Sequence, residues 1–363
     1  MIRSRDGGFT LIEIVVSLGL ATLVLVGTMG FMNAQSRSQR DSMELQTMQM
    51  GLRVGLERIM RDTRSASAGF NIGTISVQDQ TVVTATGLVN LPAVYLGTNP
   101  ALNQTNTGPG GSDVLNLVFA DGRGITNTTK DANGVVTQST TAQAINVLDV
   151  RNFVGTANYP DNFIIVSDVS NAGSAGSNAI LAKVSAVANG TWPAGTLTIA
   201  PMSTANPFPV PNFPGGSLVL TASALTYTID TSVFGTTEPA LVMVRGGPLG
   251  ITSYSDPLAT QIEDLQVALG YDGLNAGTVD GFINENVAAG ANLDEWAFNV
   301  AGDTLTGAIA TLRAVRVSLV ARSVTTRAIG LGPMTVEDHV PGTGANYLRR
   351  RLVGVASVRN LAF

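Results

Sequence analysis

The sequence has little of the residue chemistry on which many active sites depend. Its 363 residues include no cysteine and a single histidine, His339. The lack of cysteine excludes thiol nucleophiles, disulfide frameworks and cysteine-bound metals, and one histidine cannot form a multi-histidine metal site within the chain. Charged residues make up 13%, about half the roughly 25% usual in soluble domains. The formal net charge of −5 argues against a broad nucleic-acid-binding surface.

The charges that are present are distributed unevenly along the chain. The first 70 residues hold eight arginines and six acidic residues, whereas residues 71–363 hold 13 basic and 20 acidic residues. This second part combines valine with many Gly, Ser, Thr and Asn residues. Because β-branched residues favour strands and Gly, Asn and Ser favour turns, we expect a β-rich body with many turns.

Near its N-terminus the chain has one long apolar run. Residues 14–32 contain no charge and would form a helix of about 28 Å, close to the bilayer core of about 30 Å. The preceding leader, residues 1–8, carries Arg3 and Arg5, which favours a cytoplasmic position for it. We therefore expect a single-pass membrane protein with its body outside the cytoplasm.

Glu13 stands at the start of this run, where a carboxylate is unexpected. A charge in an apolar helix costs about 2.5–3.5 kcal/mol on insertion scales, so such residues usually have a function. A cleavable secretory signal would not explain it, and residues 34–36 make a poor cleavage site of that kind. A partner that fits is the backbone amine of a neighbouring subunit, freed by cleavage after Gly8.

The segment Gly8-Phe9-Thr10-Leu11-Ile12-Glu13 resembles the class III signal of type IV prepilins and pseudopilins. The resemblance implies that prepilin peptidase cuts between Gly8 and Phe9 and that the new N-terminal Phe9 is methylated. It also implies that Glu13 neutralises a neighbour's N-terminal amine during assembly.

The helix is expected to continue beyond the membrane. No proline occurs in residues 33–67, and apolar residues recur three or four positions apart. With Gly69 as a stop signal, we predict one helix over residues 9–68, which spans the membrane over residues 14–32. Gly51 and Gly55 have the spacing of a close helix contact, and a merely tolerated pair of glycines is the alternative.

After Gly69 the pattern changes to short strand-like runs between turn residues, which predicts a β-rich extracytoplasmic domain over residues 69–363 and an α+β fold overall. Residues 201–216, rich in proline, are expected to form a long loop. The predicted strands are residues 114–119, 163–166, 180–187, 196–199, 218–220, 225–229, 241–245, 265–269, 314–321 and 352–358.

Three stretches of the chain resemble PilW-type minor pilins. They are residues 57–70, residues 262–272 with 315–320, and residues 347–361. Residues 71–110 and 121–160 match no part of that family, and the C-terminal cysteine pair of many pilins is missing.

Other candidate sites are weaker. The acidic loop 272–295 includes Asp272, Asn275 and Asp280 as calcium candidates, but the spacing is not that of an EF-hand and a solvated loop is the favoured interpretation. His339 is expected in a surface loop. Arginines 349–351 would point alternately to opposite faces of a strand, which divides the charge. No catalytic constellation appears, so we predict neither an enzyme nor a cofactor beyond calcium.

The resemblance implies a minor pilin that starts in the inner membrane and then packs with other major and minor pilins in a pilus at the cell surface. Its further partners would be prepilin peptidase and the inner-membrane assembly platform. The large body favours a place at the pilus tip or in the initiation complex, in support of pilus biogenesis, twitching motility, adhesion or DNA uptake. Two alternatives stay open, a minor pseudopilin of a type II secretion system and a pilin-anchored glycan-binding adhesin.

Overall fold

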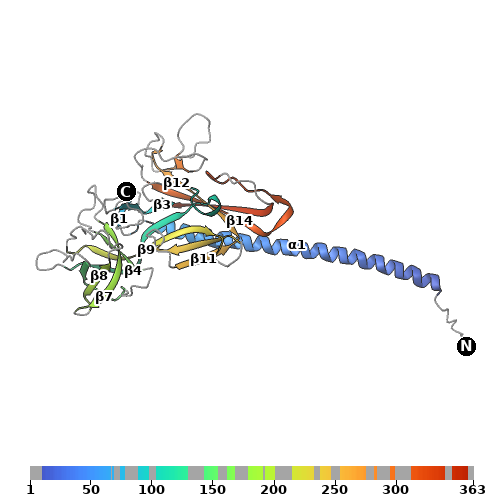
Figure 1. Ribbon diagram of the computed structural model, residues 1–363, viewed down its shortest axis with the longest axis horizontal. Helices are drawn as coiled ribbons and strands as arrows, with labels where there is room; N and C mark the ends of the chain where they lie inside the picture. Colours follow the sequence, from blue (N-terminus) through green and yellow to red (C-terminus); the bar gives the residue numbers. More distant parts are fainter. Residues whose placement is uncertain are drawn as a thin grey trace.

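A computed structural model of the chain shows one long helix followed by a β-rich body, which confirms the predicted α+β fold (Figure 1). The residues that it describes are 10–66, 68, 74–77, 89–97, 104–129, 143–153, 162–167, 179–190, 193–200, 215–232, 238–246, 254–274, 282–283, 295–298, 312–339 and 346–358. The predicted loop 201–216 lies outside these ranges apart from its last two residues.

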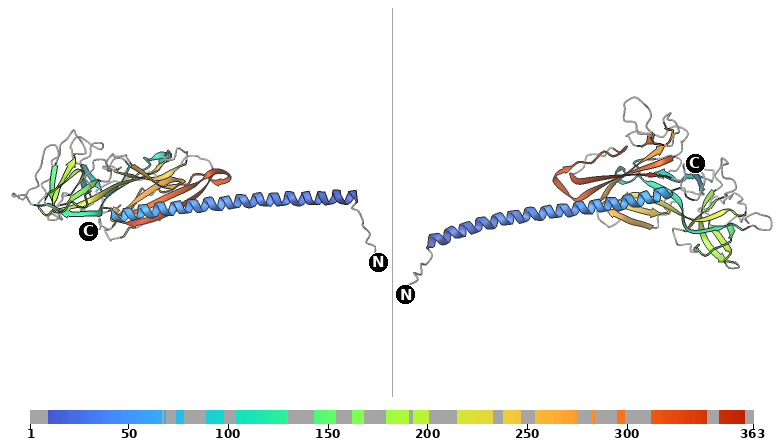
Figure 2. Two further views of the ribbon diagram at one scale, coloured as in Figure 1. Left: turned by 90° about the horizontal axis from the view of Figure 1, so that it is seen from below. Right: turned by 180° about the vertical axis from the view of Figure 1, so that it is seen from behind.

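Helix α1 runs without a break from Leu11 to Ser65, within the predicted span of 9–68. At about 1.5 Å per residue it is about 82 Å long. Thr10 caps its N-terminus through a contact with the Glu13 backbone N–H, and Ala66 follows its last turn. Both views in Figure 2 show its first half projecting from the body and its second half lying along the body.

The first sheet has eleven strands, and β9 is its hub. β9 pairs with β10, β4 and β6, and the path continues through β7 to β1 and β2. The predicted strands 218–220 and 225–229 are parts of this one strand. The strands are β1 (Thr74–Val77), β2 (Val89–Pro92), β3 (Val94–Leu96), β4 (Leu115–Asn127), β5 (Gln143–Val147), β6 (Phe163–Ser167), β7 (Ala179–Asn189), β8 (Gly195–Ala200), β9 (Leu218–Asp230), β10 (Ala240–Arg245) and β11 (Tyr254–Thr260).

The second sheet has four antiparallel strands in the order β13-β12-β14-β15. They are β12 (Ile262–Tyr271), β13 (Trp296–Ala297), β14 (Leu312–Leu331) and β15 (Tyr347–Ser357). Every predicted strand is present, whereas β1, β2, β3, β5, β11 and β13 were not predicted. These six are short or, in β11, interrupted by Pro257, so their sequences carry a weak strand signal.

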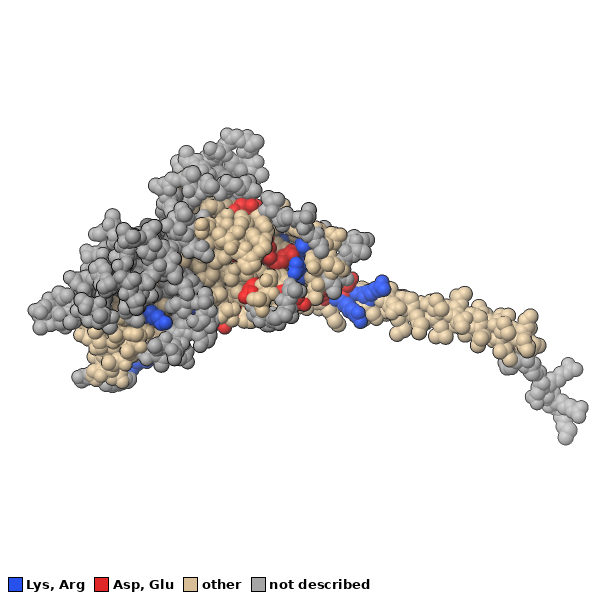
Figure 3. All heavy atoms as spheres, in the orientation of Figure 1, with Lys and Arg blue, Asp and Glu red and all other residues tan. Residues whose placement is uncertain are grey.

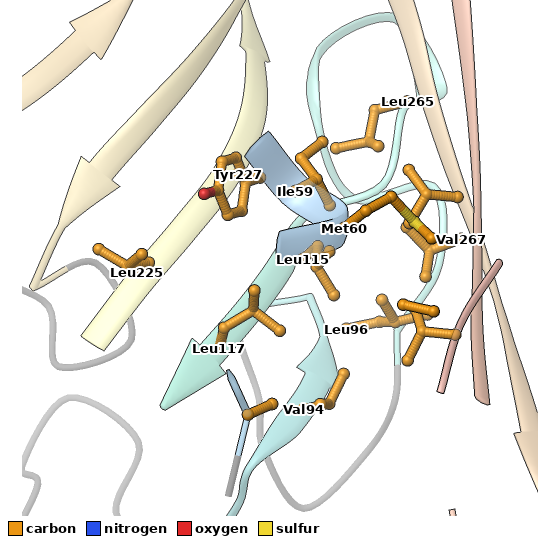
Figure 4. Packing of buried hydrophobic residues seen from close by; sticks show 14 of the residues in the cluster. Ile59, Met60, Val94, Leu96, Leu115, Leu117, Leu225, Tyr227, Leu265 and Val267 are labelled. Carbon is orange, nitrogen blue, oxygen red and sulfur yellow. The ribbon is translucent and has the colours of Figure 1, made fainter. Parts of the chain in front are cut away.

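The second half of α1 packs against both sheets and forms part of the main core. Met48 and Ile59 are fully buried, and Leu52 is almost so. Figure 4 shows Ile59 and Met60 between Tyr227 of the first sheet and Leu265 and Val267 of the second. The helix is therefore the element that both sheets share.

Gly55 permits this close packing. A Cβ atom at this position would lie 2.7 Å from Cδ2 of Leu241 and 3.4 Å from Cδ1 of Leu319. At Gly51 the nearest atom would be 3.5 Å away, which is ordinary contact. Of these two glycines, only Gly55 is at a close contact, and this contact joins the helix to the two sheets.

A buried carboxylate fixes the end of the helix to the first sheet. Asp62 is 5% exposed. It accepts hydrogen bonds from the Tyr227 hydroxyl at 2.5 Å and from Nε of Arg58 at 2.8 Å. Burial and the neighbouring carboxylate both raise the pKa of Tyr227, so the phenol keeps its proton and donates it to this bond. A more exposed arginine, Arg61, makes a longer contact of 3.3 Å with Asp62.

Replacement of Tyr227 by phenylalanine should leave the buried Asp62 carboxylate without one of its donors. We expect Tyr227→Phe to lower the free energy of unfolding by about 1.5–3 kcal/mol, the range for a hydrogen bond to a charged group. Urea unfolding of the full chain in detergent, followed by tryptophan fluorescence, measures this. Arg61→Gln is the control, with an expected loss of about 0–1 kcal/mol, and equal losses in the two variants would contradict the account.

Candidate functional site

The first half of α1 is the candidate assembly surface, and Glu13 lies in its first turn. The Glu13 side chain is exposed, and its backbone N–H bonds to the Thr10 carbonyl at 3.0 Å. An acidic group in the first turn also suits the partial positive charge of a helix N-terminus. Gly8 and Phe9 lie outside the described residues, so cleavage and methylation stay predictions.

The surface that follows is apolar on all sides. Large side chains from Leu11 to Met32 are 55–82% exposed. The most apolar 18-residue stretch has a mean hydropathy of 2.2, and none of its residues is buried. By length and composition alone, the helix could cross a membrane. Such a surface is stable only when lipid or other apolar helices cover it.

The few polar side chains in this stretch satisfy themselves within the helix. The Ser17 hydroxyl donates to the Glu13 carbonyl at 2.7 Å, and those of Thr22 and Thr28 donate to carbonyls one turn back, at 2.8 and 2.9 Å. No hydroxyl among these three needs water, which is the condition for burial in hydrocarbon. The Glu13 carboxylate is the ionisable group that this part of the helix presents.

The apolar half ends where arginines appear. Arg37 and Arg40 are exposed just before the body begins, and Figure 3 shows basic side chains gathered where the helix leaves the body. The carboxylate of Glu44 then accepts a hydrogen bond from the backbone N–H of Val324, on β14, at 2.7 Å. The free part before Glu44 is about 50 Å long, which exceeds a bilayer core of about 30 Å.

The calcium candidates are only partly described. Asp272 is fully buried, and its carboxylate meets Nε of Arg313 at 2.6 Å without the geometry of a hydrogen bond. Glu295 is also fully buried and accepts from the Gly273 N–H at 2.8 Å. The two ends of the predicted solvated loop are thus buried, because β12 and β13 pair there. Asn275 and Asp280 lie outside the described residues.

Within the described part of the chain, no group of three or more acidic or histidine side chains is arranged to hold a metal ion. Calcium binding by the loop therefore stays a prediction that rests on the sequence.

His339 lies in a turn, as expected, but it is less exposed than a surface position implies. Its side chain is only 13% exposed, and Nδ1 lies 2.9 Å from Oδ2 of Asp264 on β12. The ring also lies against Gly111, where a Cβ would come within 2.7 Å of Nε2. A tight turn from Val336 to His339, closed by two backbone hydrogen bonds, folds the histidine back onto the second sheet.

Asp113 joins the two sheets beside this histidine. It is fully buried two residues before β4, and its N–H donates to the Leu265 carbonyl at 2.7 Å. Its carboxylate accepts from the backbone N–H groups of Val267 and Asn106, at 2.8 and 2.7 Å. Asp113 thus pairs with β12 as a short strand would, and no periodic pattern marks such a contact in the sequence.

Burial dominates the electrostatics of this junction. It raises the pKa of Asp113 to about 7, against the opposing effect of two backbone hydrogen bonds, and it also raises the pKa of Asp338. The hydrogen bond with Asp264 raises the pKa of His339. All three groups therefore bind protons more tightly in the folded chain than in the unfolded chain.

A group whose pKa is higher in the folded chain than in the unfolded chain stabilises the fold most at a pH below its pKa in the unfolded chain. This contribution is lost as the pH rises through its pKa in the folded chain. We expect the free energy of unfolding to fall by about 1 kcal/mol between about pH 6 and about pH 8. Urea unfolding at several pH values tests this, with Asp113→Asn as the variant that should have a flatter profile. Stability that increases over this range would contradict the assignment.

Comparisons with known proteins agree with this geometry. The family described as "Type IV Pilus-assembly protein W" matches residues 226–360, which include β10, β11 and the second sheet. The "Prokaryotic N-terminal methylation motif" matches residues 3–29. No curated protein matches the chain.

Among solved structures, a type IV-like pilin from Thermus thermophilus is 12% identical, with a TM-score of 0.20. The match covers 39% of this chain and 68% of that one. A likeness this slight carries no argument about the present fold.

A helix that presents an apolar surface and one acidic group, followed by a β-rich body, defines a pilin-like class of protein. The two family matches, over residues 226–360 and 3–29, support a type IV pilin-like protein of the PilW type. These matches support the role of a pilin in pilus assembly, which implies other pilins and the assembly machinery as partners. The N-terminal motif and the apolar helix fit a membrane-anchored protein.

Proposed function

We propose that the chain is a minor pilin that acts at the pilus tip or in the complex that initiates assembly. The observation that carries the proposal is the exposed apolar half of α1, continuous with a helix that both sheets grip. An inner-membrane precursor would pass into a fibre by exchanging lipid for neighbouring helices around Leu11 to Met32.

The size of the body supports a terminal position. The two sheets have fifteen strands among the described residues, and they pack against only the second half of the helix. Such a head is wide relative to the slender first half of α1 (Figure 1). Repetition of this head along a thin shaft would crowd neighbouring heads, whereas one copy at the end of a fibre would not.

The processing step gives a first prediction. Cleavage between Gly8 and Phe9 by prepilin peptidase requires the glycine, so Gly8→Ala should leave the precursor uncut in the inner membrane. The mass of the protein purified from membranes measures this. If the variant were still found to begin at Phe9, the processing claim would fail.

The assembly step gives a second prediction, at Glu13. Glu13→Gln keeps the shape of the side chain but removes the charge that would pair with a neighbour's N-terminal amine. Membrane insertion should be unchanged, because a neutral residue costs less in lipid, whereas recovery of the chain in sheared fibres should fall at least about tenfold, as expected when a buried charge loses its partner.

Glu57→Gln is the matched control for this experiment. Glu57 is an exposed glutamate of the same helix. Its side chain is 73% accessible and makes a loose contact of 3.8 Å with Arg53, so its variant should enter fibres normally. Normal incorporation of the Glu13 variant, or equal loss in both, would count against pairing with an amine.

A glycan-binding adhesin is the second candidate, and the far end of the body favours it. β5, β6, β7 and β8 enclose a separate core around Ile145, Phe153 and Leu197. This lobe precedes the part that matches the PilW family and lies at the end of the molecule away from the N-terminus (Figures 1 and 2). A glycan array probed with the full chain in detergent tests it, and an array without binding would remove this candidate.

The N-terminal motif is common to pili and type II secretion systems, so a pseudopilin is the remaining alternative. Deletion of the gene separates the two functions. Loss of surface pili with normal protein secretion supports the pilus role, and the reverse result supports the pseudopilin.

A further inference from the structure

The second sheet leaves one edge strand unpaired next to the helix. β15 pairs with β14 along its length, and its other edge meets no described strand. An open edge presents backbone N–H and C=O groups that can pair with another chain, and proteins usually cover or interrupt such edges. Neither proline nor a bulge interrupts β15 between Arg349 and Ser357.

Apolar side chains are exposed on both faces of this edge strand. Gly354 faces α1, because a Cβ there would lie 3.1 Å from Cδ2 of Leu56. Strand alternation then places Leu352 on the same face and Val353 and Val355 on the opposite face. These three side chains are 36%, 40% and 50% exposed.

On the helix side, the edge borders a groove of about 520 Å³. Its apolar residues are Met50, Leu52 and Leu352, and Met50 is 71% exposed. Its charged residues are arginines from both elements, Arg53 on α1 and Arg350 and Arg351 on β15.

Two of these arginines are available to a partner. Arg53 is 79% exposed and lies 3.8 Å from Glu57, a loose contact. Arg350 is exposed and makes no ion pair with the described residues. Arg351, in contrast, is held by Glu337 and Ser318 on the other face. The groove therefore presents net positive charge to an incoming segment.

We propose that β15 is a docking edge for an extended strand of a partner protein, with acidic side chains on the face toward α1. An added strand would lie about 4.8 Å from β15 and cover Leu352 on one face and both valines on the other. A helix placed in the groove would leave Val353 and Val355 in water, so the exposed residues favour a strand. The acidic side chains would meet Arg350 and Arg53.

The test uses the full chain in detergent micelles and a short fluorescent peptide that alternates valine and glutamate. Fluorescence anisotropy should show saturable binding, and binding at least about tenfold weaker for the same peptide with lysine in place of glutamate. Binding of both peptides with equal affinity, or of neither, would overturn the proposal. The assay does not depend on processing or assembly, so it stands apart from the proposed function.

Backbone methylation distinguishes a strand from other ways of binding. Alternate backbone nitrogens of an added strand point to opposite edges, and only one edge faces β15. Methylation of the nitrogens on that edge should abolish binding, whereas methylation of the other set should leave binding intact. Binding that survives both patterns would mean a helix or a loose charge contact in the groove. Anisotropy that keeps rising with protein concentration and never saturates would mean that β15 edges of two copies associate with each other. Either outcome contradicts the proposal.

Arg350→Glu should weaken binding of the glutamate peptide by about threefold or more, because an exposed ion pair becomes a like-charge contact. Arg151→Glu is the matched control. Arg151 is also exposed, on the far lobe, and its variant changes the net charge by the same amount. Equal affinities of the two variants would remove Arg350 from the site.

Discussion

The structure depends on one continuous helix whose two halves lie in different surroundings. The first half of α1 has no partner within the described chain and is apolar on every side, whereas the second half is part of the main core. No proline or kink separates the halves, so the direction of the helix in a membrane or a fibre sets the direction of the body. Lipid before assembly and neighbouring helices after it are the two coverings that such a surface permits.

The attachment of the body to this helix is specific as well as apolar. Gly55 lets the helix approach side chains of β10 and β14, and Asp62 bonds to Tyr227 on β9. A buried carboxylate is stabilising only when its donors are kept, so this contact fixes the rotation of the helix against the sheet. Asp113 joins the second sheet to the first in a similar way, through its backbone and its carboxylate. These contacts would transmit a force along the helix to both sheets.

The sequence predicted the parts of the fold that have a strong periodic pattern. The helix and the long strands around Val317 and Leu225 were found because apolar residues repeat at helical or strand spacing over many positions. Short strands and the junction at Asp113 and His339 were missed, since they depend on contacts between residues far apart in the chain. The site divides similarly: Glu13 is conspicuous in an apolar run, whereas the open edge of β15 becomes apparent only when the sheet order is known.

The central claim is that this helix passes from the inner membrane into a fibre after its leader is removed. Mass spectrometry of the chain recovered from sheared surface fibres tests it most directly, through the mass of the N-terminal peptide. The account predicts a peptide that begins at Phe9 and carries one methyl group on its amine. A chain that keeps its leader from Met1, or that is found only in membranes and never in fibres, would contradict it.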